Sequence, residues 1–186
     1  MTAMVRTFVA IPLPQPVKAA IRRLQTGLKP SMPAIRWSAP DNLHLTLRFL
    51  GDQPEDSLEK LGDTVLSVGD SICCFSLTFS GIDAFPSWHR GRILWIGLEQ
   101  PELVSQLHQK LSDGLLQIGI PEESRPFRPH LTIGRCRQLM PLPQVPNGVL
   151  TRPIAEFRVE RLVLYQSRLT PQGARHTELC SARLRH

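Results

Sequence analysis

Two short stretches of the chain carry the same tripeptide and therefore the same chemistry-bearing side chains. HLTLRFLG begins at His44, and HLTIGR begins at His130. An imidazole can donate, accept or carry a proton near neutral pH, and a threonine hydroxyl can donate a hydrogen bond to a phosphate oxygen. Two His–Thr pairs that face each other would bracket one phosphate group with an acid, a base and two oxygen ligands.

Both stretches are predicted to be β-strands, because apolar residues alternate with polar ones. Side chains on a strand alternate between its two faces. In the first stretch His44, Thr46 and Arg48 therefore share a polar face, and Phe49 belongs to the core-facing row. The His and Thr of one pair lie roughly 6–7 Å apart, which suits two groups that hold one tetrahedral anion.

The second stretch follows the same alternation and places His130 and Thr132 on one face. Arg135 stands at an odd spacing from both, so an unbroken strand points it to the opposite face. Pro129 favours an extended conformation at Arg128 and so leads the chain into this strand. A single histidine on a strand usually has a structural role. Here the two copies preserve both the polar face and the core face of the strand, which favours a shared function.

The composition is that of a globular, basic protein. The chain has 186 residues, 41% hydrophobic and 20% charged, with a net charge of +6. We expect one domain over 1–186, and an anionic partner such as RNA or a nucleotide, although net charge alone also serves solubility. Five arginines cluster around the two motifs and are predicted to contact phosphates beyond the reacting one: Arg36, Arg48, Arg125, Arg128 and Arg135.

Cysteine spacing and the N-terminal region predict a reduced, non-membrane protein. The 4 cysteines show no CxxC or zinc-type spacing, and the adjacent Cys73 and Cys74 make a poor disulfide, so all are expected to be free thiols. The apolar run at 8–13 is interrupted by Pro12 and followed by Pro14, which argues against a signal peptide or a membrane span. We therefore expect a cytoplasmic monomer.

The pattern of apolar residues and turn residues divides the chain into short elements. Helices are predicted at 16–27, 52–70 and 101–119, with His108 exposed on the third. Strands are predicted at 7–13, 43–50, 75–79, 93–98, from 130 onward, at 157–165 as one long strand, and at 174–184. Gly51 is expected to end the first motif strand, 141–148 is a proline-rich loop, and 169–173 is a turn.

These elements favour an α+β architecture with antiparallel pairing and helices on the outer faces. Each motif occupies one strand in each half of the chain. The arrangement predicts two facing lobes that close a cleft, with His44 on one wall and His130 on the other.

At this point the residues resemble a known family. Two HxTx motifs in one small chain resemble the 2H phosphoesterase superfamily, and in particular its bacterial and archaeal RNA 2′,3′-cyclic phosphodiesterase branch, first described as 2′-5′ RNA ligases. The resemblance covers nearly the whole chain and is carried by FVAI from Phe8, NLHLTLRFLG from Asn42, FRPHLTIGR from Phe127 and LYQS from Leu164.

The resemblance implies a bilobal fold of two pseudo-symmetric antiparallel sheets and hydrolysis of RNA 2′,3′-cyclic phosphate ends to 2′-phosphomonoesters, without a metal or cofactor. It implies that His44 donates and His130 accepts the proton, that Thr46 and Thr132 hold phosphate oxygens, and that Arg135 is the arginine that ends the motif. Arg48, Phe127 and Arg128 flank the motifs and are candidate substrate contacts. The chain departs from the family at His176, where the family often has a tyrosine.

Three alternatives stay open at the level of sequence. The same residues could ligate RNA ends, because ligation is the reverse direction through one site. A nucleotide- or RNA-binding module without catalysis would need only the threonines and arginines. A metal site at His44 and His130 is disfavoured because no carboxylate or cysteine accompanies either motif at ligand spacing.

Overall fold

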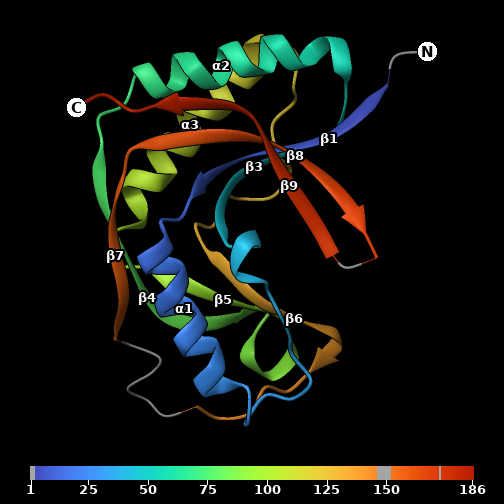
Figure 1. Cartoon of the computed structure of the whole chain (residues 1–186), viewed down its shortest axis with the longest axis vertical. Coiled ribbons are helices and arrows are strands. Elements are labelled where there is room, and N and C mark those ends of the chain that lie inside the picture. Colours follow the sequence, from blue (N-terminus) through green and yellow to red (C-terminus); the bar gives the residue numbers. More distant parts are fainter. Residues whose placement is uncertain (1–2, 146–151, 172) are drawn as a thin grey trace.

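A computed structural model describes residues 3–145, 152–171 and 173–186, and its strands form two antiparallel sheets (Figure 1). The four-stranded sheet has the order β3-β1-β8-β9, with β3 at His44–Pro54, β1 at Met4–Pro12, β8 at Arg161–Thr170 and β9 at Gly173–Arg183. The five-stranded sheet has the order β2-β6-β5-β4-β7, with β2 at Arg36–Trp37, β6 at Leu131–Met140, β5 at Gly91–Leu98, β4 at Phe75–Phe85 and β7 at Pro153–Val159. The predicted α+β class is confirmed.

Three α-helices cover the sheets in the described part of the chain: α1 at Gln15–Leu28, α2 at Leu58–Asp70 and α3 at Pro101–Gln117. α2 packs on β8 and β9, α3 packs on α2 and β3, and α1 packs on β7 (Figure 1). Gly69 permits the close approach of α2 to β9, because a Cβ at this position would lie 2.8 Å from the Cβ of Ala182. None of the helices is long and apolar enough to cross a membrane, as far as the described residues extend.

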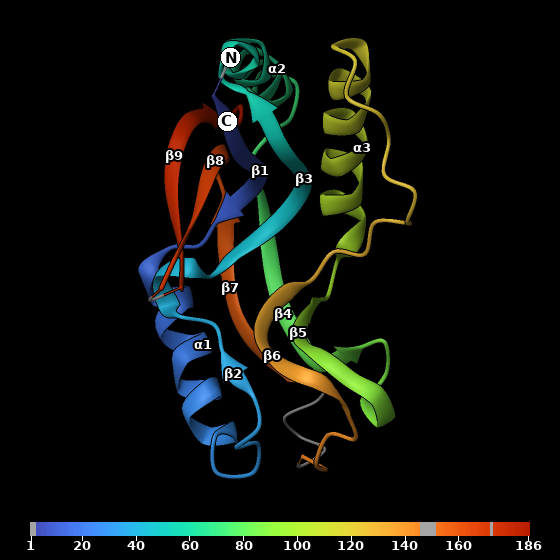
Figure 2. The ribbon, with the colours of Figure 1, turned by 90° about the vertical axis from the view of Figure 1, so that its right-hand side faces the viewer.

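The two motif strands lie in different sheets, as predicted, and β3 contacts β6 where the sheets meet (Figure 2). The division between the two sheets does not follow the two halves of the chain, however. The four-stranded sheet takes β1 and β3 from the beginning of the chain and β8 and β9 from its end. Long-range antiparallel pairing of this kind leaves no local signal in the sequence.

The predicted long strand at 157–165 is also wrong, because it is two strands in different sheets. β7 ends at Val159 and pairs with β4, whereas β8 begins at Arg161 and pairs with β1 and β9. Glu160 lies at the crossing, where its carbonyl accepts a hydrogen bond of 2.8 Å from the amide of Leu184. Apolar alternation continues through the crossing, so the change of sheet could not be read from it.

Gly51 does not end the first motif strand as predicted. β3 continues to Pro54, and Gly51 has a φ of +72°, in the left-handed region that glycine adopts at low cost. The register with β1 shifts here, since Thr7 pairs with Gly51 and Phe8 pairs with Phe49. The helix that follows therefore begins later, at Leu58, after a 3₁₀ turn over Glu55–Ser57. The predicted loop at 141–148 and turn at 169–173 lie partly outside the described residues.

Candidate active site

A β-bulge in the first motif strand changes which side chains share a face with His44. Ala10 pairs with Thr46 but Val9 pairs with Arg48, so Leu47 is an extra residue in β3. Leu47 and Arg48 are consequently both buried, and Phe49 is 58% exposed. The predicted alternation holds through Leu47 and is wrong from residue 48 onward: Phe49, and not Arg48, follows His44 and Thr46 on the polar face.

The second motif strand has a bulge at the corresponding position. Leu94 pairs with Gly134 but Trp95 pairs with Thr132, which leaves Ile133 as the extra residue in β6. Ile133 and Gly134 are both buried, and Arg135 is exposed. The strand is thus not unbroken, which was the condition for Arg135 to point away from His130, and the bulge returns Arg135 to the face of His130 and Thr132.

The two bulges make the copies equivalent beyond the shared tripeptide. Each copy presents a histidine, a threonine two residues later and a third side chain three residues after that, which is Phe49 in β3 and Arg135 in β6. Both threonines are half-buried. The polar faces of the two strands thus carry the same histidine and threonine and differ at the third side chain. This is the exposed aromatic ring of Phe49 in β3 and the guanidinium of Arg135 in β6.

His44 lies among aromatic rings from three strands. Its ring centroid is 4.7 Å from that of Phe8 and 6.2 Å from that of Tyr165, and it meets the ring of His176 edge-on at 5.2 Å. Burial lowers the pKa of His44 to about 4, with further lowering by His176 and Lys18, against a hydrogen bond to the backbone of Asn42 that raises it. His44 is therefore neutral at pH 7 in the free protein.

His130 is held by the residues just before it. Its Nδ1 lies 2.7 Å from the backbone carbonyl oxygen of Arg128, so in the neutral ring Nδ1–H donates and Nε2 keeps its lone pair. Phe85 and Trp95 stack on each other and meet the His130 ring edge-on at 5.0 and 6.0 Å. Burial and then Arg135 lower the pKa of His130, against the hydrogen bond to Arg128.

The fixed tautomer and the lowered pKa suit His130 to accept a proton at Nε2. The hydrogen bond to the residue two positions earlier recurs at His44 with Asn42. Arg128 thus contributes its carbonyl group to the site, and its exposed side chain stays a candidate substrate contact.

The predicted contacts Arg48 and Phe127 belong instead to the packing of the loop before β6. The guanidinium of Arg48 is buried, donates to the carbonyl of Pro121 and lies 3.5 Å from Glu123. Phe127 stacks on His108, with ring centroids 3.9 Å apart and an interplanar angle of 3°. The prediction that His108 is exposed is wrong, because its side chain is only 14% exposed. The structure also does not support Arg48 as a substrate contact, because its guanidinium is already bound.

Sequence reasoning missed the rings around both histidines. Phe8, Tyr165 and His176 reach His44 from strands that are distant in sequence, and Phe85 and Trp95 do the same for His130. The hairpin of β8 and β9 leaves β1 after Gln166, and the Asn42 side chain donates to the carbonyl of Ala174 near its tip at 2.9 Å. The pairing of β9 with β8 and this contact together place His176 beside His44, and no local pattern signals either.

The lowered histidine pKa values make stability depend on pH. A histidine whose pKa is lower in the folded state binds its proton more readily when unfolded, so stability is present above about pH 6.5 and falls as the pH drops toward 4. For His44 the shift from 6.5 to about 4 corresponds to roughly 3 kcal/mol. We expect His44→Gln to flatten the fall in unfolding free energy between pH 6.5 and 4, measured by urea unfolding. An unchanged slope in the variant would contradict the buried, neutral state of His44.

No group of three or more His, Cys, Asp and Glu side chains is placed to hold a metal ion within 3–145, 152–171 and 173–186. His176 and His44 are neighbours, but the groups around them are the rings of Phe8 and Tyr165. The arrangement can supply two imidazoles for proton transfer, two hydroxyls and a guanidinium. Whether a metal ion takes part in the reaction is tested by adding a chelator.

Comparison with known proteins places this geometry in a family. The model of the 2′-5′ RNA ligase superfamily matches residues 13–170. An RNA 2′,3′-cyclic phosphodiesterase of Methanothermobacter thermautotrophicus is 31% identical over 178 residues, which cover 94% of this chain and 96% of that protein. TT0787 of Thermus thermophilus has a similar structure, with a TM-score of 0.84 at 30% identity over 97% of this chain and 98% of that one.

A further solved structure, E. coli LigT complexed with 3′-AMP, aligns with a TM-score of 0.81 at 28% identity, over 99% of this chain and 100% of that one. The family match includes both motifs, and the two structural likenesses extend over nearly the whole chain. The chain therefore belongs to the 2′-5′ RNA ligase superfamily.

Proposed function

We propose that this protein hydrolyses RNA 2′,3′-cyclic phosphate ends to 2′-phosphomonoesters, with His44 and His130 as the acid–base pair. The observation that carries the proposal is the duplicated strand face, in which equivalent bulges place a histidine, a threonine and a third side chain alike in both sheets. The names of the relatives support the substrate class. Duplicated faces of this kind match a reaction that needs one proton accepted and one donated at a single phosphorus atom.

His130 acts as the base. Its Nε2 takes a proton from water while the water oxygen bonds to phosphorus, and the hydrogen bond from Nδ1 to Arg128 supports the positive charge that forms on the ring. Arg135 favours the neutral form of His130 before the reaction, because it lowers the pKa of this ring.

His44 acts as the acid. The bond from phosphorus to the ribose 3′ oxygen breaks, and the proton on His44 passes to this oxygen, which leaves a 3′ hydroxyl and a 2′ phosphomonoester. A pKa of about 4 means that His44 in the free protein lacks this proton at neutral pH. The anionic cyclic phosphate raises the pKa of His44 when it binds, so substrate and proton bind together.

Thr46, Thr132 and Arg135 hold the phosphate. Their positions on the two polar faces support hydrogen bonds from the threonine hydroxyls to the non-bridging oxygens, and the guanidinium offsets the charge that develops on them. Phe49, equivalent to Arg135 in the other sheet, offers an exposed ring on which a base can stack.

The test is a hydrolysis assay on a nucleoside 2′,3′-cyclic phosphate, with and without a chelator. We expect turnover to be unchanged by the chelator, because both proton transfers are made by imidazoles. Activity that disappears with the chelator and returns with a divalent cation contradicts the proposed mechanism. Adding RNA with a 5′ hydroxyl end to the same assay separates hydrolysis from ligation by the length of the product.

A further inference from the structure

The segment that leads from α3 into His130 is neither helix nor strand over residues 118–130. Figure 2 shows it leaving the end of α3 and passing alongside this helix before it enters β6. Among the described residues, no backbone-to-backbone hydrogen bond holds residues 121–129. The Arg128 carbonyl that accepts the hydrogen bond from Nδ1 of His130 belongs to this segment, so side-chain contacts must hold it in place.

The first of these contacts comes from β3. The β-bulge buries Arg48, and its guanidinium donates to the carbonyl of Pro121 and lies 3.5 Å from Oε2 of Glu123. A buried guanidinium needs a negative partner and hydrogen-bond acceptors, and this segment supplies both. Arg48 stands two residues after Thr46, so the first motif strand binds the segment that leads to the second motif.

The second contact comes from α3. Oε2 of Glu123 also lies 3.8 Å from Nε2 of His108, and the His108 ring stacks on Phe127 with centroids 3.9 Å apart. The next residue is Arg128, whose carbonyl oxygen lies 2.7 Å from Nδ1 of His130. Four side chains thus form a continuous series of contacts from β3 to the proposed base, here named the loop clamp: Arg48, Glu123, His108 and Phe127.

We propose that the loop clamp positions His130 for catalysis. It holds the Arg128 carbonyl against Nδ1 of this ring and so leaves Nε2 to accept the proton from water. The inference rests on the proposed function, in which His130 is the base, and adds side chains that act through His130 and not on the substrate. Because a catalytic group that is misplaced by about 1 Å can cost on the order of 10²-fold in rate, the clamp controls the rate from a distance.

The kinetic test removes the stacked ring. Phe127→Ala is expected to lower kcat for a nucleoside 2′,3′-cyclic phosphate by roughly 10–10²-fold, the order for a misplaced catalytic group. KM is expected to stay unchanged, since the loop clamp does not bind the substrate. Phe127→Tyr keeps the ring and is expected to keep kcat. Arg48→Met is expected to lower kcat in the same way from the other end of the clamp.

The tautomer of His130 reports the position of its ring independently of activity. NMR of the imidazole nitrogens, recorded at a pH at which His130 is neutral, is expected to show the Nδ1–H form in the unmodified protein and in Phe127→Tyr. Phe127→Ala is expected to show a mixture of both tautomers, because the carbonyl acceptor is no longer fixed. A role in stability alone would lower the midpoint of thermal unfolding and leave the tautomer and kcat unchanged.

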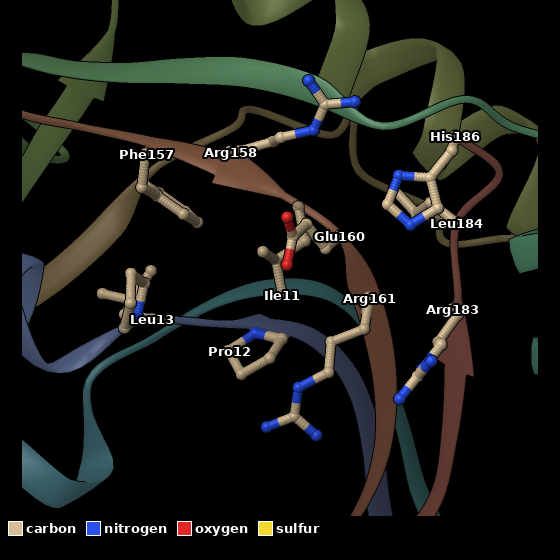
Figure 3. A pocket seen from close by; sticks show the side chains of 11 residues that line it. Ile11, Pro12, Leu13, Phe157, Arg158, Glu160, Arg161, Arg183, Leu184 and His186 are labelled. Carbon is tan, nitrogen blue, oxygen red and sulfur yellow. The ribbon is translucent and has the colours of Figure 1, made fainter.

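Two substitutions control for the change of charge. Glu122→Gln is the match for Glu123→Gln, because Glu122 is exposed in the same segment and makes no ion pair among the described residues. Arg183→Met is the match for Arg48→Met, because Arg183 is exposed at the end of β9, beside the cavity shown in Figure 3, and belongs to none of the contacts of the loop clamp. Both controls are expected to keep kcat and the His130 tautomer, whereas Glu123→Gln lowers kcat.

Unchanged kcat and a single Nδ1–H tautomer in Phe127→Ala overturn the inference. A raised KM at unchanged kcat also overturns it, because Phe127 would then contact the substrate. If Arg48→Met does not fold, the two Phe127 variants decide, since this side chain is only half-buried. If the unmodified protein does not hydrolyse the cyclic phosphate, the proposed function fails, and the tautomer of His130 in Phe127→Ala still decides whether the clamp positions the ring.

Discussion

Replacing His130 by alanine is expected to reduce kcat/KM for a nucleoside 2′,3′-cyclic phosphate by roughly 10²–10⁴-fold, the usual contribution of a positioned base. The reason is structural: the hydrogen bond to the Arg128 carbonyl fixes the ring so that Nε2 is the free acceptor. No other described residue offers an imidazole at this position, since the neighbours of His130 are Phe85 and Trp95. Steady-state kinetics of the purified variant measure the loss.

His89→Ala is the matched control, because His89 is exposed on a 3₁₀ turn at Trp88–Arg90 and makes no contact with the His130 ring among the described contacts. It should keep the rate of the unmodified protein. Thermal unfolding of both variants shows whether the fold is retained. A rate for His130→Ala near that of the unmodified protein contradicts its role as base.

Replacing His44 by alanine is expected to cause a similar loss on the cyclic phosphate, but not on a phosphodiester with a good aryl leaving group. An acid helps only when the leaving oxygen needs a proton, and an aryl oxide leaves without one. His130→Ala should slow both substrates, because each needs an activated water. The ratio of the two rates in each variant therefore assigns acid and base separately.

If His130→Ala hydrolyses the aryl phosphodiester at a normal rate and His44→Ala does not, His130 is the acid and His44 is the base. Equal losses on both substrates in His44→Ala would instead indicate that His44 binds phosphate and donates no proton. His44→Gln is a useful companion variant, since it keeps a hydrogen-bond donor in the buried position beside Phe8.

The residues of the site were predictable from the sequence because they are local. His44 and Thr46, like His130 and Thr132, need only a strand to share a face, and the repeat indicated a common role. The alternation beyond them was not predictable, because each bulge adds one residue to a strand and reverses every later side chain. This reversal exposed Phe49, buried Arg48 and brought Arg135 to the site.

The surroundings of the site depend on pairing between distant strands, which sequence alone does not reveal. Tyr165 and His176 reach His44 only because β8 pairs with β1 and the tip of the β8–β9 hairpin contacts Asn42.

The pH dependence of kcat/KM tests the central claim, catalysis by two imidazoles, most directly. kcat/KM reports the protonation states of the free protein, and the proposed mechanism needs a protonated His44 and a neutral His130. The pKa values of both histidines are lowered, that of His44 to about 4. We predict a bell-shaped profile of a coupled pair, with its maximum below pH 6.5 and a falling limb that approaches tenfold per pH unit above it. A profile that rises steadily to high pH, as attack by hydroxide gives, would contradict the account.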